Sequence, residues 1–305
     1  MNSRKPLLIC IVGPTAIGKT SLAIQLAKHF KTEIISADSR QFFKEMRIGT
    51  AVPSEIELSQ APHHFIQNKS IFELYSVGDF EREATLLLSE LFRKHSIVIM
   101  VGGSGLYVDA VVKGLDNFPA VNEDVRKELN TQFEKEGIAS LQRELLQVDP
   151  EYHSKVDLQN HHRLIRALEI YRSTGKPFSS FFNENKKERI FDTLYIGLTA
   201  DRETVYERIN QRVDLMMEEG LLEEAKKLLP NKSLNALQTV GYKELFQYLE
   251  GDLTLEEAIS EIKKNTRRFA KRQGTWFKKN QDIHWFDFTT DISEIKKLIE
   301  TKNAQ

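Results

Sequence analysis

The sequence has almost no cysteine, no long apolar run and almost no net charge. Its single cysteine, Cys10, excludes an internal disulfide, and its place inside an apolar stretch is typical of an inert core residue. No apolar run approaches the roughly 18 residues that a membrane helix needs. The first residues lead from a short apolar run directly into a glycine-containing loop, which favours a first strand over a signal peptide. We therefore expect a cytoplasmic enzyme that does not enter a membrane.

The net charge of −1 hides one strongly basic segment. The stretch "KKNTRRFAKRQGTWFKKN", residues 263–280, carries +8 and no acidic residue, so the rest of the chain carries −9. Its basic residues are Lys263, Lys264, Arg267, Arg268, Lys271, Arg272, Lys278 and Lys279. This concentration is typical of a polyanion-binding surface on an otherwise acidic body. A solvated helix face is the alternative interpretation.

Apolar, β-rich runs alternate with helical patterns along most of the chain. The runs are "LLICIV" (7–12), "EIISA" (33–37), "IVIMV" (97–101), "LYIGLT" (194–199) and, less clearly, "IHWFDF" (283–288). Strands buried on both faces and separated by helices predict a parallel sheet with helices on each side. Between these parts, residues 115–187 have helical periodicity, and Gly175 and Pro177 end the last helix. We therefore expect an α/β core, residues 1–114 and 188–305, with an inserted all-helical domain.

The stretch "GPTAIGKT" matches G-x-x-x-x-G-K-[ST], the phosphate-binding loop of P-loop NTPase-like folds. An apolar strand precedes it and an amphipathic helix follows it, as this loop requires. The backbone N–H groups converge on phosphate oxygens, Lys19 adds a positive charge and Thr20 can bind Mg²⁺. The predicted phosphate-binding residues are Gly13, Pro14, Thr15, Ala16, Ile17, Gly18, Lys19 and Thr20.

Two further loops are expected at the same edge of the sheet. Asp38 follows the second strand in "SADSRQ", and "VGGSGLY" (101–107) follows the third, with glycines where a hydrolysing NTPase carries an acid. Ligands bind outside the carboxyl ends of parallel strands, so Asp38 should face the group that Lys19 holds. From this position alone, Asp38 can be a Mg²⁺ ligand, a cap of a helix or turn, or a general base. Ser104 can donate a hydrogen bond, or the stretch can be a plain glycine-rich turn before a helix.

Seven stretches occur in the order seen in tRNA dimethylallyltransferases, also called tRNA isopentenyltransferases. They are "GPTAIGKTSLA", "EIISADSRQ", "VGGSGLY", "RLIRALEIYRSTGKP", "RINQRVDLMMEEGLLEE", "TVGYKE" and "RRFAKRQGTWF", within about residues 7–280. The sequence thus resembles a family that transfers a prenyl group from dimethylallyl diphosphate to N6 of the adenosine 3′ of the anticodon, with Mg²⁺. The resemblance implies that the phosphate loop grips a prenyl diphosphate and not a nucleoside triphosphate.

The resemblance also implies roles for individual residues. Asp38 would be the general base, and Arg212 would hold the diphosphate together with Lys19, Thr20 and the loop amides. Ser104 stands where the family usually has threonine, which keeps the hydroxyl and loses a methyl group. The residues implied to contact tRNA are Asp38, Ser39, Arg40, Gln41, Ser104, Arg126, His162, Arg163, Leu164, Ile165, Arg166, Gln238, Thr239, Val240, Gly241, Tyr242 and Lys243. The implied partners are dimethylallyl diphosphate and the anticodon stem-loop of a tRNA, for a monomeric enzyme.

Other interpretations fit the phosphate loop alone. A nucleoside-type small-molecule kinase shares the loop and an inserted lid, and an RNA-binding switch could use a nucleotide only to change shape. Both leave "SADSRQ" and the basic segment unexplained. The adjacent pairs His63–His64 and His161–His162 lack spaced metal-ligating partners, so RNA contact or packing is favoured over a metal site.

Overall fold

The computed structural model describes residues 5–116, 118–119, 121–182 and 188–304. They form two compact units, and the second, Gly114–Glu188, is inserted between the two segments that make the first. The expected insertion, 115–187, falls inside this second unit. No described helix is long and apolar enough to span a lipid bilayer.

The first unit is built on a six-stranded sheet in which all neighbouring strands are parallel. The strands are β1 (Leu7–Val12), β2 (Ile34–Ser36), β3 (His63–His64), β4 (Ile97–Val101), β5 (Asp192–Thr199) and β6 (Ile283–Asp287), in the spatial order β3-β2-β4-β1-β5-β6. The predicted parallel sheet is confirmed. Strand β3 was not predicted, because its two histidines give no apolar run.

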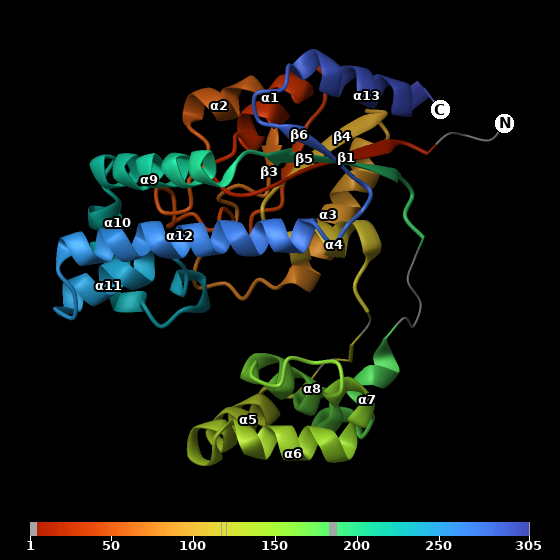
Figure 1. The fold of residues 1–305 in the computed structure, drawn as a ribbon. Coiled ribbons are helices and arrows are strands. Elements are labelled where there is room, and N and C mark those ends of the chain that lie inside the picture. Colours follow the sequence, from red (N-terminus) through yellow and green to blue (C-terminus); the bar gives the residue numbers. More distant parts are fainter. Residues whose placement is uncertain (1–4, 117, 120, 183–187, 305) are drawn as a thin grey trace. The chain divides into compact units, whose positions relative to one another are not determined.

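Helices cover both faces of the sheet, which explains why its central strands are apolar throughout. All residues of β1 and β4 are buried, as expected for strands that pack on both sides. One face packs against α1 (Lys19–Phe30) and α13 (Ile292–Ala304), and the other against α3 (Val77–Leu91) and α4 (Gly105–Lys113) (Figure 1). Because β2, β4 and β1 are neighbours, the loops that follow them form one rim.

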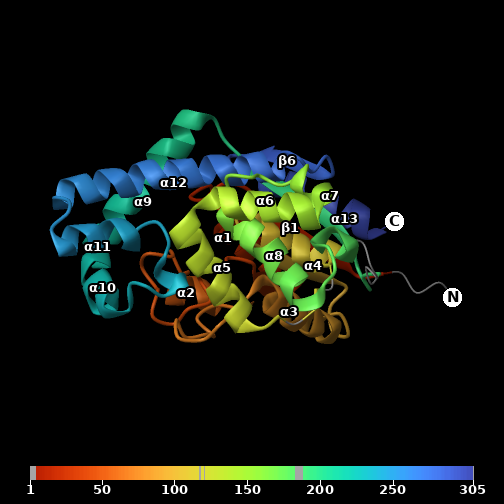
Figure 2. The same cartoon turned by 90° about the horizontal axis from the view of Figure 1, so that it is seen from below.

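A group of helices extends the first unit beyond the sheet. α9 (Arg202–Glu218), α10 (Leu221–Leu228) and α11 (Tyr242–Glu250) gather around the first half of the long helix α12 (Leu255–Phe277) (Figures 1 and 2). These helices share an apolar core that includes Leu221, Tyr242 and Leu245. The other end of α12 reaches the sheet, where Phe277 packs with strand residues. The basic segment therefore runs from this helical group to the sheet.

The second unit has a core of its own. It contains α5 (Glu123–Glu136), α6 (Ile138–Val148), α7 (Pro150–His153), α8 (His161–Thr174) and a 3-10 turn at Phe178–Phe181. Leucines from α5, α6 and α8 are fully buried together: Leu129, Leu141, Leu145, Leu164 and Leu168. Gly175 ends α8 in the left-handed conformation, as its position after the last periodic residue predicted. The described residues of this unit form no strand, so its predicted all-helical character is confirmed.

Candidate active site

The phosphate loop joins β1 to α1 and uses backbone conformations that glycine allows. Gly13 has a φ of 139°, and a side chain there would place a Cβ atom 2.5 Å from the carbonyl oxygen of Leu198 on β5. Gly18, with a φ of 107°, is the N-cap of α1. These conformations explain why the motif has glycine at both positions. The N-terminus of α1 adds a partial positive charge that favours an anion.

Side chains from distant helices hold this loop in place. Arg208 Nε of α9 donates to the carbonyl oxygen of Ala16 at 2.8 Å. Gln273 Oε1 of α12 accepts the N–H of Thr15 at 2.8 Å. Ala16 has a φ of 65°, an uncommon conformation for a residue with a side chain, and it needs support from its surroundings. Both contacts come from the protein itself and support this loop conformation.

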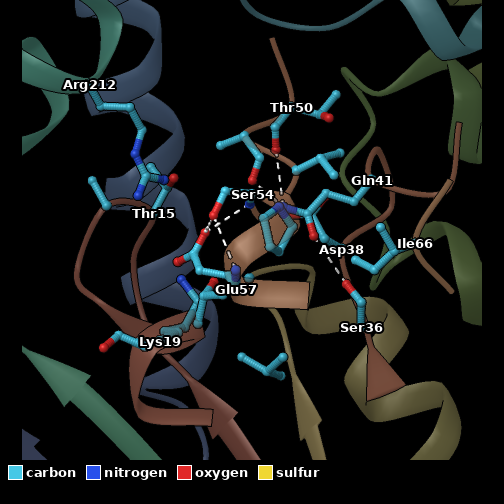
Figure 3. A pocket seen from close by; sticks show the side chains of 18 of the residues that line it. Thr15, Lys19, Ser36, Asp38, Gln41, Thr50, Ser54, Glu57, Ile66 and Arg212 are labelled. Carbon is cyan, nitrogen blue, oxygen red and sulfur yellow. Dashed lines mark hydrogen bonds between the residues drawn. The ribbon is translucent and has the colours of Figure 1, made fainter. Parts of the chain in front are cut away.

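The loop lines a pocket of about 600 Å³ at the carboxyl ends of the strands. In Figure 3, Arg212 lies on one side of this pocket, and Asp38 and Gln41 lie on the opposite side. Arg208 also lines the pocket. It precedes Arg212 by one turn of α9, so both guanidinium groups project from the same face of the helix. The pocket thus has basic side chains from two separate elements, α1 and α9.

The cations of the pocket are crowded and half-buried. Burial, and to a smaller extent Arg212, lower the pKa of Lys19 from 10.5 to about 7, while Asp38 acts in the opposite direction. Burial and then Arg208 lower the pKa of Arg212. Lys19 Nζ donates to the carbonyl oxygen of Pro14 at 2.7 Å. Buried like charges destabilise each other, and a polyanion would relieve this repulsion. The pocket therefore suits a ligand with several negative charges.

Asp38 follows β2 and faces the same pocket. Its Oδ1 atom accepts the N–H of Arg40 at 3.0 Å, so a turn cap, one of the roles considered from the sequence, is present. The carboxylate also lines the pocket, and its charge acts on Lys19 and Arg212. Turn capping and contact with a ligand are therefore compatible for this residue.

The loop after β4 packs against the loop that carries Asp38. A Cβ atom at Gly102 would lie 2.4 Å from the carbonyl oxygen of Ala37. The Ser104 hydroxyl accepts the N–H of Ser39 and donates to the Ser39 hydroxyl, both at 3.2 Å. The structure thus brings the three predicted loops together at one rim.

A smaller recess of about 120 Å³ opens beside the main pocket. Thr15, Asp38 and Arg212 line both. The lining of the recess also includes seven apolar side chains from α9 to α12 and the segments between them: Ile209, Val213, Met216, Leu221, Val240, Ile262 and Phe269. A cationic pocket and a largely apolar recess therefore meet at Asp38.

Proteins of known family match this chain along nearly their whole length. The family model for IPP transferase matches residues 41–280. The chain is 62% identical over 295 residues to a tRNA dimethylallyltransferase of Christiangramia forsetii, which covers 97% of this chain and 98% of that protein. It is 61% identical over 301 residues to a tRNA dimethylallyltransferase of Flavobacterium psychrophilum, with coverage of 97% and 98%.

Solved structures give the same relationship. The tRNA isopentenylpyrophosphate transferase of Bacillus halodurans is similar with a TM-score of 0.74 and 41% identity, over 98% of this chain and 97% of that one. A eukaryotic dimethylallyltransferase acting on tRNA is similar with a TM-score of 0.78 and 31% identity, over 95% of this chain and 75% of that one. The chain belongs to the IPP transferase family of tRNA dimethylallyltransferases. It is therefore a transferase, and the small-molecule kinase and the non-enzymatic switch are excluded.

Two side chains that the resemblance to IPP transferases assigned to tRNA are bonded within the protein. Arg40 Nη1 donates to the carbonyl oxygens of residues 235 and 236 at 3.0 and 3.1 Å. Gln41 Nε2 donates to the carbonyl oxygens of residues 50 and 51 at 3.1 and 2.9 Å. Both side chains therefore shape the rim of the pocket, and their contact with RNA remains a prediction.

The segment 238–243, also assigned to tRNA, has one fully buried side chain. The hydroxyl of Tyr242 donates to Glu224 Oε1 at 2.7 Å, and the Glu224 carboxylate also accepts the N–H groups of residues 47–49. Tyr242 thus supports the rim from inside and does not present its side chain to a macromolecule. Of the other residues, Gln238 and Lys243 are exposed, Thr239 and Val240 are half-buried, Gly241 is buried, and these last three line the recess.

In the second unit, a buried carboxylate holds two of the predicted RNA-contacting arginines. Glu169 Oε2 accepts bonds from Arg126 Nη2 at 2.8 Å and from Arg166 Nη1 at 2.9 Å. His162 and Arg163 are exposed on α8, whereas Leu164 and Ile165 are buried in the core of this unit. A partner can therefore reach Arg126, His162, Arg163 and Arg166, but not the two buried residues.

The basic segment of α12 is only partly compensated by acidic neighbours. Lys263 pairs with Asp214 at 2.6 Å, and Lys264 pairs with Glu261. The following residues Arg268, Lys271 and Arg272 are exposed. The positive charge that a polyanion can reach therefore lies in the second half of the helix.

The paired histidines do not form a metal site within the described part of the chain, where no group of three or more potential ligands gathers. His64 Nε2 lies 2.7 Å from Glu33 Oε2, and His63 Nδ1 donates to the carbonyl oxygen of Ala61 at 2.8 Å. His161 stacks on Phe133. His64 and His63 are thus hydrogen-bonded within the protein, His63 also lines the main pocket, and His161 packs on an aromatic ring; RNA contact by these residues remains a prediction.

Sequence reasoning missed Arg208, Glu224 and Gln273. Arg208 had a usable signal, because it stands four positions before Arg212 in a helical pattern. Glu224 and Gln273 had none, since each looks like an ordinary polar residue of a charged helix. Their roles depend on residues far away in the chain.

Proposed function

We propose that this protein transfers the dimethylallyl group of dimethylallyl diphosphate to N6 of the adenosine 3′ of the anticodon in tRNA. The observation that supports this most is the position of Asp38 between a cationic pocket and a largely apolar recess. A prenyl diphosphate has a polyanionic end and an apolar end, and so it matches both. A nucleoside triphosphate would leave the apolar recess without an apolar ligand.

The diphosphate would occupy the pocket of the phosphate loop. Lys19 and Arg212 would neutralise its charge, and Arg208 would add a further cation through the guanidinium nitrogens beyond its Nε contact with Ala16. A guanidinium group can bond two phosphate oxygens at once. These cations stabilise the charge that grows on the leaving group as the bond to carbon breaks. The prenyl chain would extend toward the recess.

A magnesium ion fits this pocket as a partner of the diphosphate. Mg²⁺ prefers oxygen ligands and usually binds through one or two carboxylates together with substrate phosphates and water. The pocket offers the Thr20 hydroxyl and the Asp38 carboxylate, which is a small oxygen donor set of this kind. Thr20 would hold the ion, and Asp38 could reach it. When bound, the ion would neutralise part of the charge of the leaving diphosphate.

Asp38 would act as the general base. The adenine N6 amine is a weak nucleophile, because its lone pair is delocalised into the ring. Its attack on the allylic carbon forms the carbon–nitrogen bond while the carbon–oxygen bond breaks, and diphosphate leaves with the bonding electrons. Asp38 accepts the proton that N6 loses. The base must leave its stack in the anticodon loop to reach this carboxylate.

The tRNA would be held mainly through phosphate contacts with basic side chains. Candidates are the exposed residues of α12 in the first unit and Arg126, Arg163 and Arg166 in the second. Such contacts attract RNA without reading its sequence. We expect the enzyme to act in the cytoplasm as a monomer.

Mass spectrometry of RNA tests the proposal. The pure protein is incubated with dimethylallyl diphosphate, Mg²⁺ and an anticodon stem-loop with adenosine 3′ of the anticodon. The RNA should gain one C5H8 unit at that base, and a matched stem-loop with guanosine there should gain none. The absence of an adduct on several candidate tRNAs, with folded protein, would refute the proposal.

A further inference from the structure

A buried glutamine of α12 joins two of the three loops at the rim. Gln273 is 6% exposed, although it lies in the most basic part of the chain. Its Oε1 atom accepts the N–H of Thr15 at 2.8 Å, and its Nε2 atom donates to the carbonyl oxygen of Gly103 at 3.1 Å. One amide group therefore connects the phosphate loop to the loop after β4.

The contacts continue from the loop after β4 to the loop that carries Asp38. The Ser104 hydroxyl bonds to the N–H and the hydroxyl of Ser39. Gly102 packs so closely on Ala37 that an added Cβ atom would lie 2.4 Å from the Ala37 carbonyl oxygen. A continuous path of contacts thus runs from the phosphate loop, through the amide of α12, to the residues on both sides of Asp38.

The chemistry of this link suits an amide at position 273 and glycine at position 103. A backbone N–H can only donate and a carbonyl oxygen can only accept, so the linking side chain must carry one acceptor and one donor. The glutamine amide has both. A Cβ atom at Gly103 would lie only 2.1 Å from Gln273 Nε2. Gly103 and Gln273 are therefore a complementary pair.

We propose that Gln273 is a positioning residue that sets the distance between the loop holding the donor diphosphate and the loop carrying Asp38. This inference rests on the proposed function, because the two loops hold the leaving group and the base of that reaction. A misplacement of about 1 Å can reduce a rate by roughly 10²-fold. Gln273 acts through the two loops and touches neither substrate.

A double-mutant cycle tests the link. Gly103→Ala forces the amide aside without changing charge, and Gln273→Ala removes the amide and leaves room for the new methyl group. Each single variant should lower turnover roughly tenfold to a hundredfold. The double variant should be no slower than Gln273→Ala, because the two substitutions break the same contact.

Gly274→Ala is the matched control. It adds the same methyl group to the next residue of α12, where an added Cβ atom meets nothing within 4 Å. Its turnover should equal that of the wild type. Thermal unfolding and the affinities for tRNA and for inorganic diphosphate are measured for every variant, because a loss of fold would lower all of them together. A positioning role predicts lower turnover with nearly unchanged tRNA affinity.

Several outcomes would overturn the inference. Full turnover in Gly103→Ala or in Gln273→Ala would show that the amide sets no essential distance. If the fold reductions in turnover of the two single variants multiply in the double variant, Gly103 and Gln273 have separate roles. If Gly103→Ala does not fold, Gln273→Ala decides alone, since it adds no atoms. A wild-type protein without product would refute the proposed function itself, whereas an active wild type with unaffected variants refutes the positioning role only.

Discussion

Diphosphate binding should weaken as the pH rises above about 7, and the reason lies in Lys19. Its amine lines the pocket, and loss of solvent together with Arg212 lowers the pKa of Lys19 to about 7. Below that pH the amine is charged and attracts the anion. Above it, the neutral form predominates in the empty pocket. A bound diphosphate favours the charged amine, so binding at higher pH must take up a proton.

The size of the effect follows from this value. Each pH unit above the pKa reduces the charged fraction of Lys19 about tenfold, which corresponds to about 1.4 kcal/mol of binding free energy. About half of the amines are charged at pH 7 and about one in a hundred at pH 9, so the affinity for inorganic diphosphate should fall about fiftyfold over this range, as long as the bound diphosphate keeps the amine charged. Near pH 7 about half of the amines are neutral, so binding should take up about half a proton.

Titration calorimetry in buffers with different ionisation heats measures both quantities. The Lys19→Arg variant keeps a positive charge at every pH used. Ionisation of the diphosphate changes the affinity of this variant and of the wild type equally, so the difference between the two reports on Lys19 alone. His63 should not contribute above pH 7, because burial lowers its pKa from 6.5. In Arg212→Met the affinity should begin to fall only at a higher pH, because Arg212 contributes to the lowered pKa of Lys19. A pH-independent wild-type affinity, or an equal slope in Lys19→Arg, would refute the reasoning.

Three further predictions concern the proposed reaction. Asp38→Asn should lower turnover by about 10²–10⁴-fold with unchanged tRNA affinity, and near-normal turnover would leave Asp38 only its turn cap. Arg212→Lys keeps the charge but loses the paired contact with phosphate oxygens, so the donor KM should rise or turnover fall; a loss of tRNA affinity alone would assign Arg212 to RNA. Glutamine at three exposed basic positions of α12 should flatten the salt dependence of tRNA binding by roughly 0.7–0.9 in log–log slope per lost phosphate contact, whereas glutamine at Lys297 and Lys302 of α13 should not. The three positions are Arg268, Lys271 and Arg272. An unchanged salt dependence would show that α12 makes no phosphate contact with tRNA.

Most of the sheet could be predicted from the sequence because its signals are local. β1 and β4 are continuous apolar runs buried on both faces, and the phosphate loop between β1 and α1 has fixed glycine positions. Asp38 could be placed at the rim because it lies two residues after the end of β2. β3 could not be predicted, since its histidines are recruited to the sheet only by pairing with β2.

The supports of the loops could not be predicted because they depend on contacts between distant residues. Gln273 is 258 positions away from Thr15, and Arg208 is 192 positions away from Ala16. No periodicity or motif shows which helix satisfies a given backbone group of a loop. The resemblance has a similar limit, because a family motif does not separate side chains that face a partner from a buried one such as Tyr242.

The order of the strands explains how a phosphate loop can serve transfer in place of hydrolysis. A hydrolysing NTPase carries an acid after a buried strand to hold Mg²⁺ and orient water. Here β4, which lies between β1 and β2, is followed by Gly102 and Gly103. A Cβ atom at Gly102 would lie 2.4 Å from the carbonyl oxygen of Ala37, and one at Gly103 would displace the amide of Gln273. The acid stands one strand further from the phosphate loop, at Asp38, where the cationic pocket meets the largely apolar recess. A carboxylate there can take a proton from a nucleophile that approaches the far end of the donor, beyond its diphosphate. Under the proposed function, an acid displaced by one strand would serve attack on carbon and not attack on phosphorus.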